Sequence, residues 1–501
     1  MGLRRILAIA SFLLYAIAAT VAIRQEPSIW AAEFSTVIPA AISNVVYGLQ
    51  LGLIDSNVDA EFKETFRAEG LNPGSLEKAV NRAAQGDIPH GMPLPAYEGI
   101  GMGQTLFSAA AMRLFGPHLS SLGYGFLLLM GFSVLAFVGR YKGALLAFVP
   151  LQFFALTCML LTPLITNQDV LDEAPIGGNR FFGILAILPA LHIFFEFADG
   201  AKPERGARKN LIILGVQLFI FVLVLLVRSS NAYMLAPIVC AGLFSTLRDN
   251  RAERYRIYLK CGIAYVLSVV FLSIMIASAP YYLKTGRIGG IIWHRAFVSF
   301  VNHPEWPFGN LRDVYQCEKY IPEGLQRTGN ADRNGHCVWM AYPPNQTRPI
   351  QEVQEKTYGP EYERALRGAV FNVIFSYPRQ ALELYLYYKP IIVATTLRAA
   401  LDWKLYSVPP PILFFAVLQA MVFIWFCILS ATTMPFKVPT MFGVLALLFL
   451  FSLAPQLVAW ASLWTSPDLI FYMYATFLLV AALITQTLTS LICHTQFYKI
   501  R

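Results

Sequence analysis

Long apolar runs separated by short polar segments dominate the pattern of this chain of 501 residues. A helix that crosses the apolar core of a bilayer needs about 20 mostly apolar residues, whereas a soluble helix shows only a one-sided apolar stripe. Runs of the first kind recur along the sequence, so we expect about ten transmembrane helices. They cover residues 6–22, 121–139, 143–162, 181–198, 210–227, 232–247, 261–279, 411–431, 438–459 and 468–492.

The connections between these runs alternate in their content of Lys and Arg, which concentrate on the cytoplasmic side of a membrane. The short connections at 163–178 and 460–467 contain neither residue. Both termini are therefore predicted to be cytoplasmic. The basic segments contain Arg4, Arg5, Arg140, Lys142, Lys202, Arg205, Arg208, Lys209, Arg248, Arg251, Arg254, Arg256, Lys260, Lys437, Lys499 and Arg501.

The sequence thus predicts an all-α polytopic membrane protein with two large extracytoplasmic loops. Residues 383–400 are ambiguous because Lys389 and Arg398 interrupt an apolar stretch, and a span there would reverse the topology of everything after it. We interpret this stretch as a helix lying along the bilayer surface. The expected parts are the first helix 1–22, the loop 23–120, six helices in 121–279, the loop 280–410 and three helices in 411–501.

The first loop has helical patterns of its own. Residues 36–54 have an amphipathic pattern, and residues 58–70 and 75–84 are typical of short polar helices separated by a Pro-Gly turn. Residues 101–115 form a further expected helix, which Gly116 and the following proline end before the next span.

Composition supports the membrane class. Hydrophobic residues make up 56% of the chain and charged residues 14%, against about 25% charged in soluble domains. The formal net charge of +9 could indicate nucleic acid as a partner. We reject that interpretation because the basic residues lie mostly in short connections, where they set topology, and form no long block of like charge.

Two of the seven cysteines, Cys317 and Cys337, lie in the larger predicted outer loop. Cysteines that face an oxidising compartment pair readily, so a disulfide between these two is expected. A zinc site is the alternative, because His336 adjoins Cys337, although the loop contains no Cys-x-x-Cys motif. We identify no metal site or cofactor in the sequence.

The segment 95–122, PAYEGIGMGQTLFSAAAMRLFGPHLSSL, follows one span and a long outer loop and precedes many spans. With a weaker likeness in 179–197, this order resembles the GT-C superfamily of integral-membrane glycosyltransferases. The resemblance implies an enzyme that moves a sugar from a polyprenyl-phosphate carrier to an extracytoplasmic acceptor. It also implies the bacterial inner (plasma) membrane, with periplasmic loops. The family has an Asp-Glu pair and a Tyr after its first span, where this chain has Asp59, Glu61 and Phe62.

Such a transfer needs a carboxylate to accept a proton and cations to hold the departing phosphate. From the first-loop acids, which also include Asp55 and Asp87, we take Asp59, Glu61 and Glu98 as catalytic candidates. For each of these acids the alternative is an ordinary solvated loop residue. For His294, a candidate for substrate binding, the alternative is a packed loop core. The substrate-binding candidates are Arg180, Asp169, Asp172, His294 and Arg295.

Other functions stay open at this stage. The chain has no Walker, Gly-x-Ser-x-Gly, His-Glu-x-x-His or haem-attachment motif. The first alternative is a transporter of a lipid-linked or small substrate, for which the polar residues within spans, chiefly Gln217, Gln419 and Gln486, would matter. The second is a non-catalytic subunit whose outer loops bind a partner protein. Expected partners are membrane lipids, a lipid-linked sugar and an unknown acceptor or protein at the outer face.

Overall fold

The computed structural model shows a mostly helical chain. Its described residues fall into two units, which are treated separately below. The first unit comprises Met1–Ala279, Trp403–Phe451 and Ile470–Arg501, and the second comprises Pro280–Asp402 and Ser452–Leu469. Apart from isolated positions, the structure describes residues 2–25, 37–69, 73–95, 102–142, 145–146, 148–161, 181–199, 207–227, 292–298, 332–349, 352–353, 356–357, 359–391 and 410–430.

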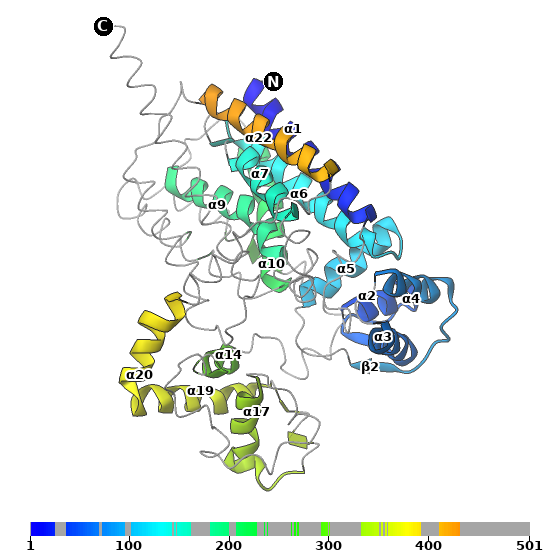
Figure 1. Cartoon of the computed structure of the whole chain (residues 1–501), viewed down its shortest axis with the longest axis vertical. Helices are drawn as coiled ribbons and strands as arrows, with labels where there is room; N and C mark the ends of the chain where they lie inside the picture. The colour runs from blue at the N-terminus through cyan, green and yellow to red at the C-terminus, as the bar shows by residue number, and fades with distance from the viewer. Residues whose placement is uncertain are drawn as a thin grey trace. The chain divides into compact units, whose positions relative to one another are not determined.

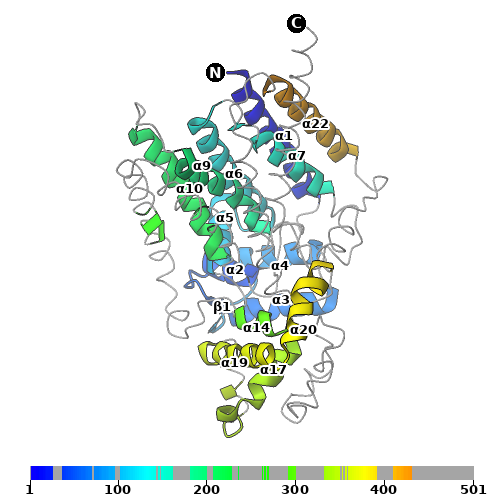
Figure 2. The same cartoon turned by 90° about the vertical axis from the view of Figure 1, so that its left-hand side faces the viewer.

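A bundle of apolar helices forms the larger part of the first unit. Figure 1 shows α1, α6, α7 and α22 side by side, and Figure 2 shows α9 and α10 beside α6. These helices are apolar on most sides, as expected for elements surrounded by other helices and lipid. Their bounds are α1 Leu3–Gln25, α6 Ser120–Arg140, α7 Phe148–Leu161, α9 Ile187–Asp199, α10 Ala207–Val227 and α22 Pro410–Ser430, with the 3-10 helix η3 at Phe181–Ala186.

Three helices in the described part of the chain are long and apolar enough to cross a membrane. They are Leu3–Arg24, Ser120–Arg140 and Asn210–Val227. Large apolar side chains such as Leu13 and Leu135 remain exposed on them, which is the surface that lipid would cover. The helical class of the chain is therefore confirmed, and the three apolar helices suggest a membrane association. The count of about ten spans and the direction of the termini stay predictions.

Two polar contacts join helices inside this bundle. The Ser11 hydroxyl on α1 donates to the Gln419 amide oxygen on α22 at 2.9 Å, and the Ser133 hydroxyl on α6 donates to the Gln217 oxygen on α10 at 2.9 Å. The amide nitrogen of Gln217 also donates to the Ser133 carbonyl at 2.8 Å. Hydrogen bonds of this kind stabilise helix pairs in an apolar medium.

The segment between α1 and α6 folds into short helices and a two-stranded sheet. The amphipathic helix expected over 36–54 ends at Val46, because Gly48 and Gly52 take positive φ angles of 64° and 92°. The chain then enters strand β1, which pairs with β2 in antiparallel register, so that Asp55 lies opposite Pro93. This sheet departs from the all-α expectation. The elements are α2 Val37–Val46, β1 Leu53–Asp55, α3 Ser56–Glu69, α4 Pro73–Gln85, β2 Pro93–Pro95 and α5 Met102–Phe115.

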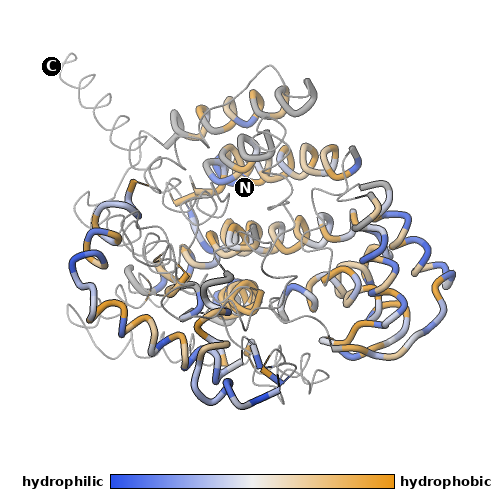
Figure 3. The backbone as a smooth tube through the Cα atoms, turned by 60° about the horizontal axis from the view of Figure 1, so that its bottom comes forward, coloured by the Kyte–Doolittle hydropathy of each residue, from blue (hydrophilic) through white to orange (hydrophobic). Residues whose placement is uncertain are grey.

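Figure 3 shows the difference in hydropathy between these parts, with more hydrophilic segments in α3 and α4 than in the apolar bundle. The expected polar helices at 58–70 and 75–84 correspond to α3 and α4, and the expected helix at 101–115 corresponds to α5. Gly116, at a φ of 97°, ends α5 where the sequence predicts its end.

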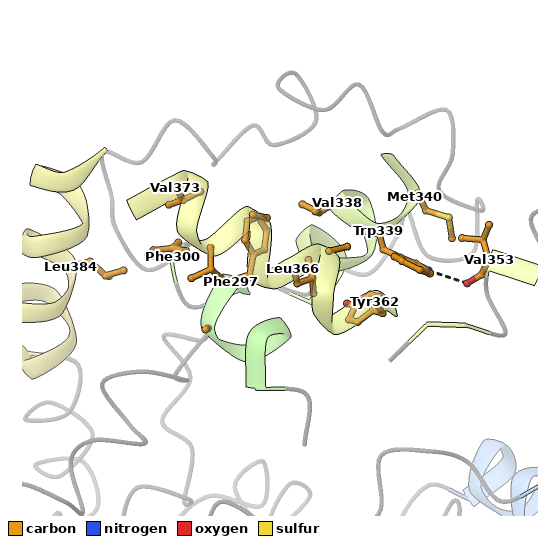
Figure 4. Close-up of a cluster of buried hydrophobic side chains, with 14 residues drawn as sticks. Phe297, Phe300, Val338, Trp339, Met340, Val353, Tyr362, Leu366, Val373 and Leu384 are labelled. Carbon is orange, nitrogen blue, oxygen red and sulfur yellow. Dashed lines mark hydrogen bonds between the residues drawn. The ribbon is translucent and has the colours of Figure 1, made fainter. Parts of the chain in front are cut away.

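The second unit packs its helices around an aromatic core. Trp339 lies at its centre with no solvent exposure, and its indole N–H donates to the Val353 carbonyl at 2.9 Å (Figure 4). Tyr362 and Leu366 from α19 are equally buried. The elements are α14 Ile292–Val298, α17 Asp332–Ala341, η8 Pro343–Asn345, α19 Pro360–Ser376, α20 Pro378–Glu383 and the π-helical turn η9 Leu384–Tyr388.

Candidate functional site

Asp55 is the last residue of β1 and the residue just before α3. Its Oδ1 accepts hydrogen bonds from the backbone N–H groups of Asn57, at 2.9 Å, and Val58, at 3.2 Å. This is the N-cap arrangement, in which a short acidic side chain satisfies the otherwise unpaired N–H groups of a first helical turn. The Asp55 backbone N–H in turn donates to the Ser43 hydroxyl on α2 at 3.0 Å.

The second carboxylate oxygen of Asp55 binds the chain leading into β2. Oδ2 lies 2.5 Å from the His90 Nδ1 and accepts the Gly91 N–H at 2.8 Å. Asp55 is fully buried, whereas the His90 side chain is 54% exposed. Because a carboxylate only accepts, we assign the Nδ1–H tautomer to His90, which leaves Nε2 as the ring nitrogen available to an external group.

The hydrogen bonds decide the charge of Asp55. Burial by itself would raise the pKa of its carboxyl, but the hydrogen bonds from His90, Gly91, Val58 and Asn57 outweigh burial and lower that pKa below its ordinary value of 3.8. Asp55 is therefore an anion at neutral pH.

The His90 ring is held on its flat side by Tyr47. The two rings stack with centroids 5.0 Å apart and an angle of 5° between their planes. The Tyr47 hydroxyl donates to the Ile88 carbonyl at 2.6 Å. Burial, together with the nearby charge of Asp55, raises the pKa of Tyr47, so that this hydroxyl keeps its proton.

Gly91 allows the segment after His90 to pass very close to the start of α3. A Cβ atom at this position would lie 2.3 Å from the Ser56 Oγ and 2.9 Å from the Asn57 side chain. Ser56 also exchanges hydrogen bonds with Met92, since its N–H donates to the Met92 carbonyl at 2.9 Å and its hydroxyl accepts the Met92 N–H at 3.0 Å. Only glycine fits this close approach.

A buried carboxylate that orients a partly exposed histidine is an arrangement suited to general-base catalysis. The carboxylate fixes the tautomer and the ring orientation, and it stabilises the imidazolium that forms when Nε2 takes a proton. We call Asp55, His90 and Tyr47 the dyad site. Sequence reasoning included Asp55 among the first-loop acids but selected other acids for catalysis.

Two of the three selected first-loop acids, Asp59 and Glu61, lie in ion pairs. Asp59 binds Lys63 one helical turn later at 2.6 Å, and Glu61 binds Arg82 on α4. Within the described part of this loop, no hydrogen bond joins either acid to Asp55 or His90. Both contacts are typical of a solvated helix surface, which was the structural alternative for these residues.

Several of the other predicted site residues fall outside the described residues. They are Glu98, Asp169, Asp172, Arg180 and Cys317, and the side chain of Arg295 is likewise not described. Cys337 is buried at the core of the second unit. The disulfide with Cys317 and the roles of the remaining residues therefore stay predictions. In the ranges that the structure describes, no group of three or more His, Cys, Asp or Glu side chains is placed to hold a metal.

His294 lies in the core of the second unit. Its ring is fully buried, and its Nδ1 lies 2.6 Å from the Tyr362 hydroxyl. The Glu363 carboxylate accepts the backbone N–H groups of Trp293, at 2.8 Å, and His294, at 3.1 Å, at the start of α14. The ring therefore takes part in packing, which is the alternative to a substrate-binding role that the sequence left open.

A cationic side chain contacts the end of α2, the helix that Tyr47 of the dyad site follows. Arg113, at the end of α5, donates through one terminal nitrogen to the Asn44 side-chain oxygen at 2.9 Å and the Asn44 carbonyl at 3.3 Å. Arg113 is exposed, and among the described residues no carboxylate forms an ion pair with it. The adjoining Leu114 and Phe115 are also exposed.

A separate polar cluster joins α6 to α9. Arg140 binds Glu196 at 2.5 Å, and the Tyr141 hydroxyl donates to the His192 carbonyl at 3.0 Å. The sequence placed Arg140 in a basic connection, which is the predicted cytoplasmic side. This contact is an ion pair between two helix ends and shares no residue with the dyad site.

Comparison with known proteins gives no relative for this chain, since no family model, no curated protein and no solved structure matches it.

Proposed function

We propose that this chain is a membrane-embedded glycosyltransferase that uses a polyprenyl-phosphate-linked sugar, with His90 as the general base. The Asp55–His90 pair carries the proposal. It combines a buried anionic carboxylate with a histidine whose side chain is partly exposed. The donor class comes from the GT-C resemblance of the sequence, and the dyad replaces Asp59, Glu61 and Glu98 as the proposed base.

The end of α2 supports this proposal because it holds both a base and a cation. Ser43 binds the backbone of Asp55, Asn44 binds Arg113, and Tyr47 stacks on His90. Ser43 and Asn44 lie in the last turn of α2, and Tyr47 directly follows that helix. One short segment therefore contacts both the proposed base and the proposed cation.

Arg113 fits the role of holding the donor phosphate. Residues 116–119 alone separate α5 from α6, and α6 is a candidate span. Arg113 therefore belongs near the end of that span. Arginine matches the geometry of phosphate, and the exposed Leu114 and Phe115 suit the attached apolar chain. Arg180, which the sequence suggested for this role, remains a second candidate.

The proposed reaction is a displacement at the sugar. His90 Nε2 takes the proton of the acceptor hydroxyl while the acceptor oxygen bonds to the anomeric carbon. The bond from that carbon to the phosphate oxygen breaks, and the lipid phosphate leaves with the electron pair. Asp55 stabilises the imidazolium, and Arg113 stabilises the negative charge on the leaving phosphate.

Two of the three glutamines expected to matter for a transporter have packing roles, and the third, Gln486, lies outside the described residues. Gln217 and Gln419, which would matter for a transport pathway, form hydrogen bonds between neighbouring helices. Their amide groups therefore contribute to helix packing.

The test uses full-length protein in proteoliposomes with a panel of polyprenyl-phosphate sugars and a membrane extract as the source of acceptors. Release of free polyprenyl phosphate is measured by mass spectrometry. We expect release with at least one donor, and we expect His90→Gln to lower its rate by about 10²–10⁴-fold. Glu61→Gln, a carboxylate change on the same loop, should alter the rate by less than about threefold.

Two results would overturn the proposal. If the wild-type protein consumes no donor in the panel, a non-catalytic subunit that binds a partner becomes the better interpretation. If His90→Gln releases polyprenyl phosphate as fast as the wild type, His90 is not the base. A thermal-unfolding measurement on each variant distinguishes a lost base from a lost fold.

A further inference from the structure

One face of the second unit exposes large apolar side chains. The face runs from the second half of α19 through α20 and η9. Phe375 is 78% exposed and Leu386 is 75% exposed. Several large exposed apolar side chains on successive helices mark a place where another apolar surface binds. The members of this exposed face are Phe371, Phe375, Tyr377, Leu382, Leu386, Tyr387 and Ile391.

The exposed face arises from amphipathic helices whose other side is fully packed. Val370 and Val373 on α19 and Leu384 on η9 belong to the buried aromatic core. Figure 4 shows Val373 and Leu384 among its side chains. Phe371 and Phe375 are one helical turn apart on the outer side, and their rings stack with centroids 6.3 Å apart. The exposed apolar groups therefore form an ordered surface on a folded support.

Cationic side chains continue the same face. Arg364 and Arg367 are exposed on α19, and their spacing to Phe371 and Phe375 keeps all four on one side of the helix. Arg379, at the start of α20, is also strongly exposed, with a side-chain exposure of 84%. Arginine beside Phe, Tyr and Leu is the composition of surfaces that lie at the boundary of a lipid bilayer.

The chain connection supports lipid as the occupant. Residues 392–409 are all that separates Ile391 from α22, whose 21 residues contain no charge. The sequence predicts that α22 is a span, so a surface this close to it in sequence can reach the membrane boundary. The positive charge of the arginines also matches anionic lipid headgroups.

We propose that the exposed face of α19, α20 and η9 lies in the interfacial layer of the membrane. Its apolar side chains would reach the upper part of the acyl chains, while Arg364 and Arg367 bind lipid phosphates. This inference uses no residue of the dyad site and does not depend on the proposed enzymatic activity. It extends the surface-helix interpretation of 383–400 to the preceding helices.

The experiment places a fluorescent amino acid, in separate variants of the full chain, at Phe375, at Leu386 and at Gln346. Gln346 is the matched control because it is exposed and polar in the same unit. In proteoliposomes, lipids with brominated acyl chains should quench the probes at 375 and 386 at least about twofold more than the control probe. Iodide in the water should quench the control probe more strongly.

Two outcomes contradict the proposal. Strong iodide quenching at 375 and 386 would mean that the face is in water. Protection from both quenchers would mean that protein covers it, either a second copy of this chain or a partner. A further variant, Arg364→Gln with Arg367→Gln, should weaken bromolipid quenching at 375 in anionic vesicles and leave it unchanged in zwitterionic vesicles. Equal behaviour in the two lipids would exclude a role for the arginines.

Discussion

Asp55 in the first unit and Lys389 in the second are both buried, with exposures of 0% and 2%. Their surroundings nevertheless favour opposite charge states, since they favour the charged form of Asp55 and the neutral form of Lys389. Burial alone would raise the pKa of Asp55, yet its hydrogen bonds lower that pKa below 3.8. Burial lowers the pKa of Lys389 to about 7. The centroid of the Tyr385 ring lies 4.3 Å from the ammonium nitrogen of Lys389.

This comparison shows that burial does not determine the charge state on its own. Donors aimed at both oxygens of Asp55 replace the water that folding removes, so the anion is kept. At Lys389 burial dominates, so the neutral amine is favoured near and above neutral pH. A buried group that keeps its charge can stabilise a developing positive charge nearby, which is what catalysis by His90 would require.

The largest expected effect is that of Asp55→Asn. An amide can still cap α3 through its oxygen, but its NH₂ group faces two donors, His90 and Gly91, and can no longer stabilise an imidazolium. The rate of transfer should fall by about two to four orders of magnitude, measured as release of polyprenyl phosphate. A wild-type rate in this variant would remove the dyad site from the mechanism.

The same variant has a pH signature. Because the folded-state pKa of Asp55 lies below its unfolded value, its charge contributes stability above about pH 4 that is lost as the pH falls through the folded-state pKa. Wild-type protein should therefore lose stability more steeply in acid than Asp55→Asn, measured as the melting temperature of the first unit between about pH 5 and 3. Parallel curves would contradict the assignment of the lowered pKa.

A smaller effect is expected from Lys389→Met. The folded-state pKa of Lys389, about 7, lies below its ordinary value of 10.5, so the unfolded chain binds a proton between these values that the folded chain does not. The free energy of unfolding of the second unit should therefore rise with pH from about 7 to 10 and lie lower below pH 7. Lys389→Met should flatten this rise and stabilise the unit at pH 7 by on the order of 1 kcal/mol.

Lys356→Met is the matched control for that measurement. Lys356 is partly exposed and pairs with Glu352 at 2.7 Å on the surface of the same unit. Its removal should leave the pH dependence above neutrality in place. Hydrogen exchange of the backbone amides of α19, followed across this pH range, reports on the second unit separately. An unchanged slope in Lys389→Met would assign the buried amine no role.

The smallest effect is expected from Arg82→Ala, which breaks the ion pair with Glu61. Both side chains are partly exposed, at 52% and 21%, so water and salt screen the interaction. The change in the free energy of unfolding should stay below about 1 kcal/mol, measured by thermal unfolding, and transfer should continue at the wild-type rate. A loss of activity without unfolding would return Glu61 to the list of catalytic candidates.

The sequence predicted the helical membrane class from particular segments. Residues 6–22, 121–139 and 210–227 correspond to the three helices able to cross a membrane. The breaker residues also located the helices of the first loop, since Pro73 and Gly74 are the first residues of α4 and Gly116 ends α5. Apolar length and backbone constraints are local properties, so they can be determined without a fold.

Local pattern also contained part of the dyad site. Asp55 lies three residues before the expected helix at 58–70, within the short polar stretch where an N-cap is expected, and in the structure it directly precedes α3, which begins at Ser56. The capping bonds from Asn57 and Val58 agree with that signal. What the pattern did not indicate was that Asp55 also has a second set of donors.

The pairing of Asp55 with His90 was decided by tertiary structure alone. The two residues are 35 positions apart, and they meet because β1 pairs with β2 and because Gly91 lets the returning chain pass against α3. The sheet itself was not predictable, since its strands are three residues long and one of them begins and ends with proline. The sequence by itself determined which segments are helical and apolar, because those preferences act over one or two turns. Which carboxylate would be buried, hydrogen-bonded and charged depended on contacts between segments far apart in the chain.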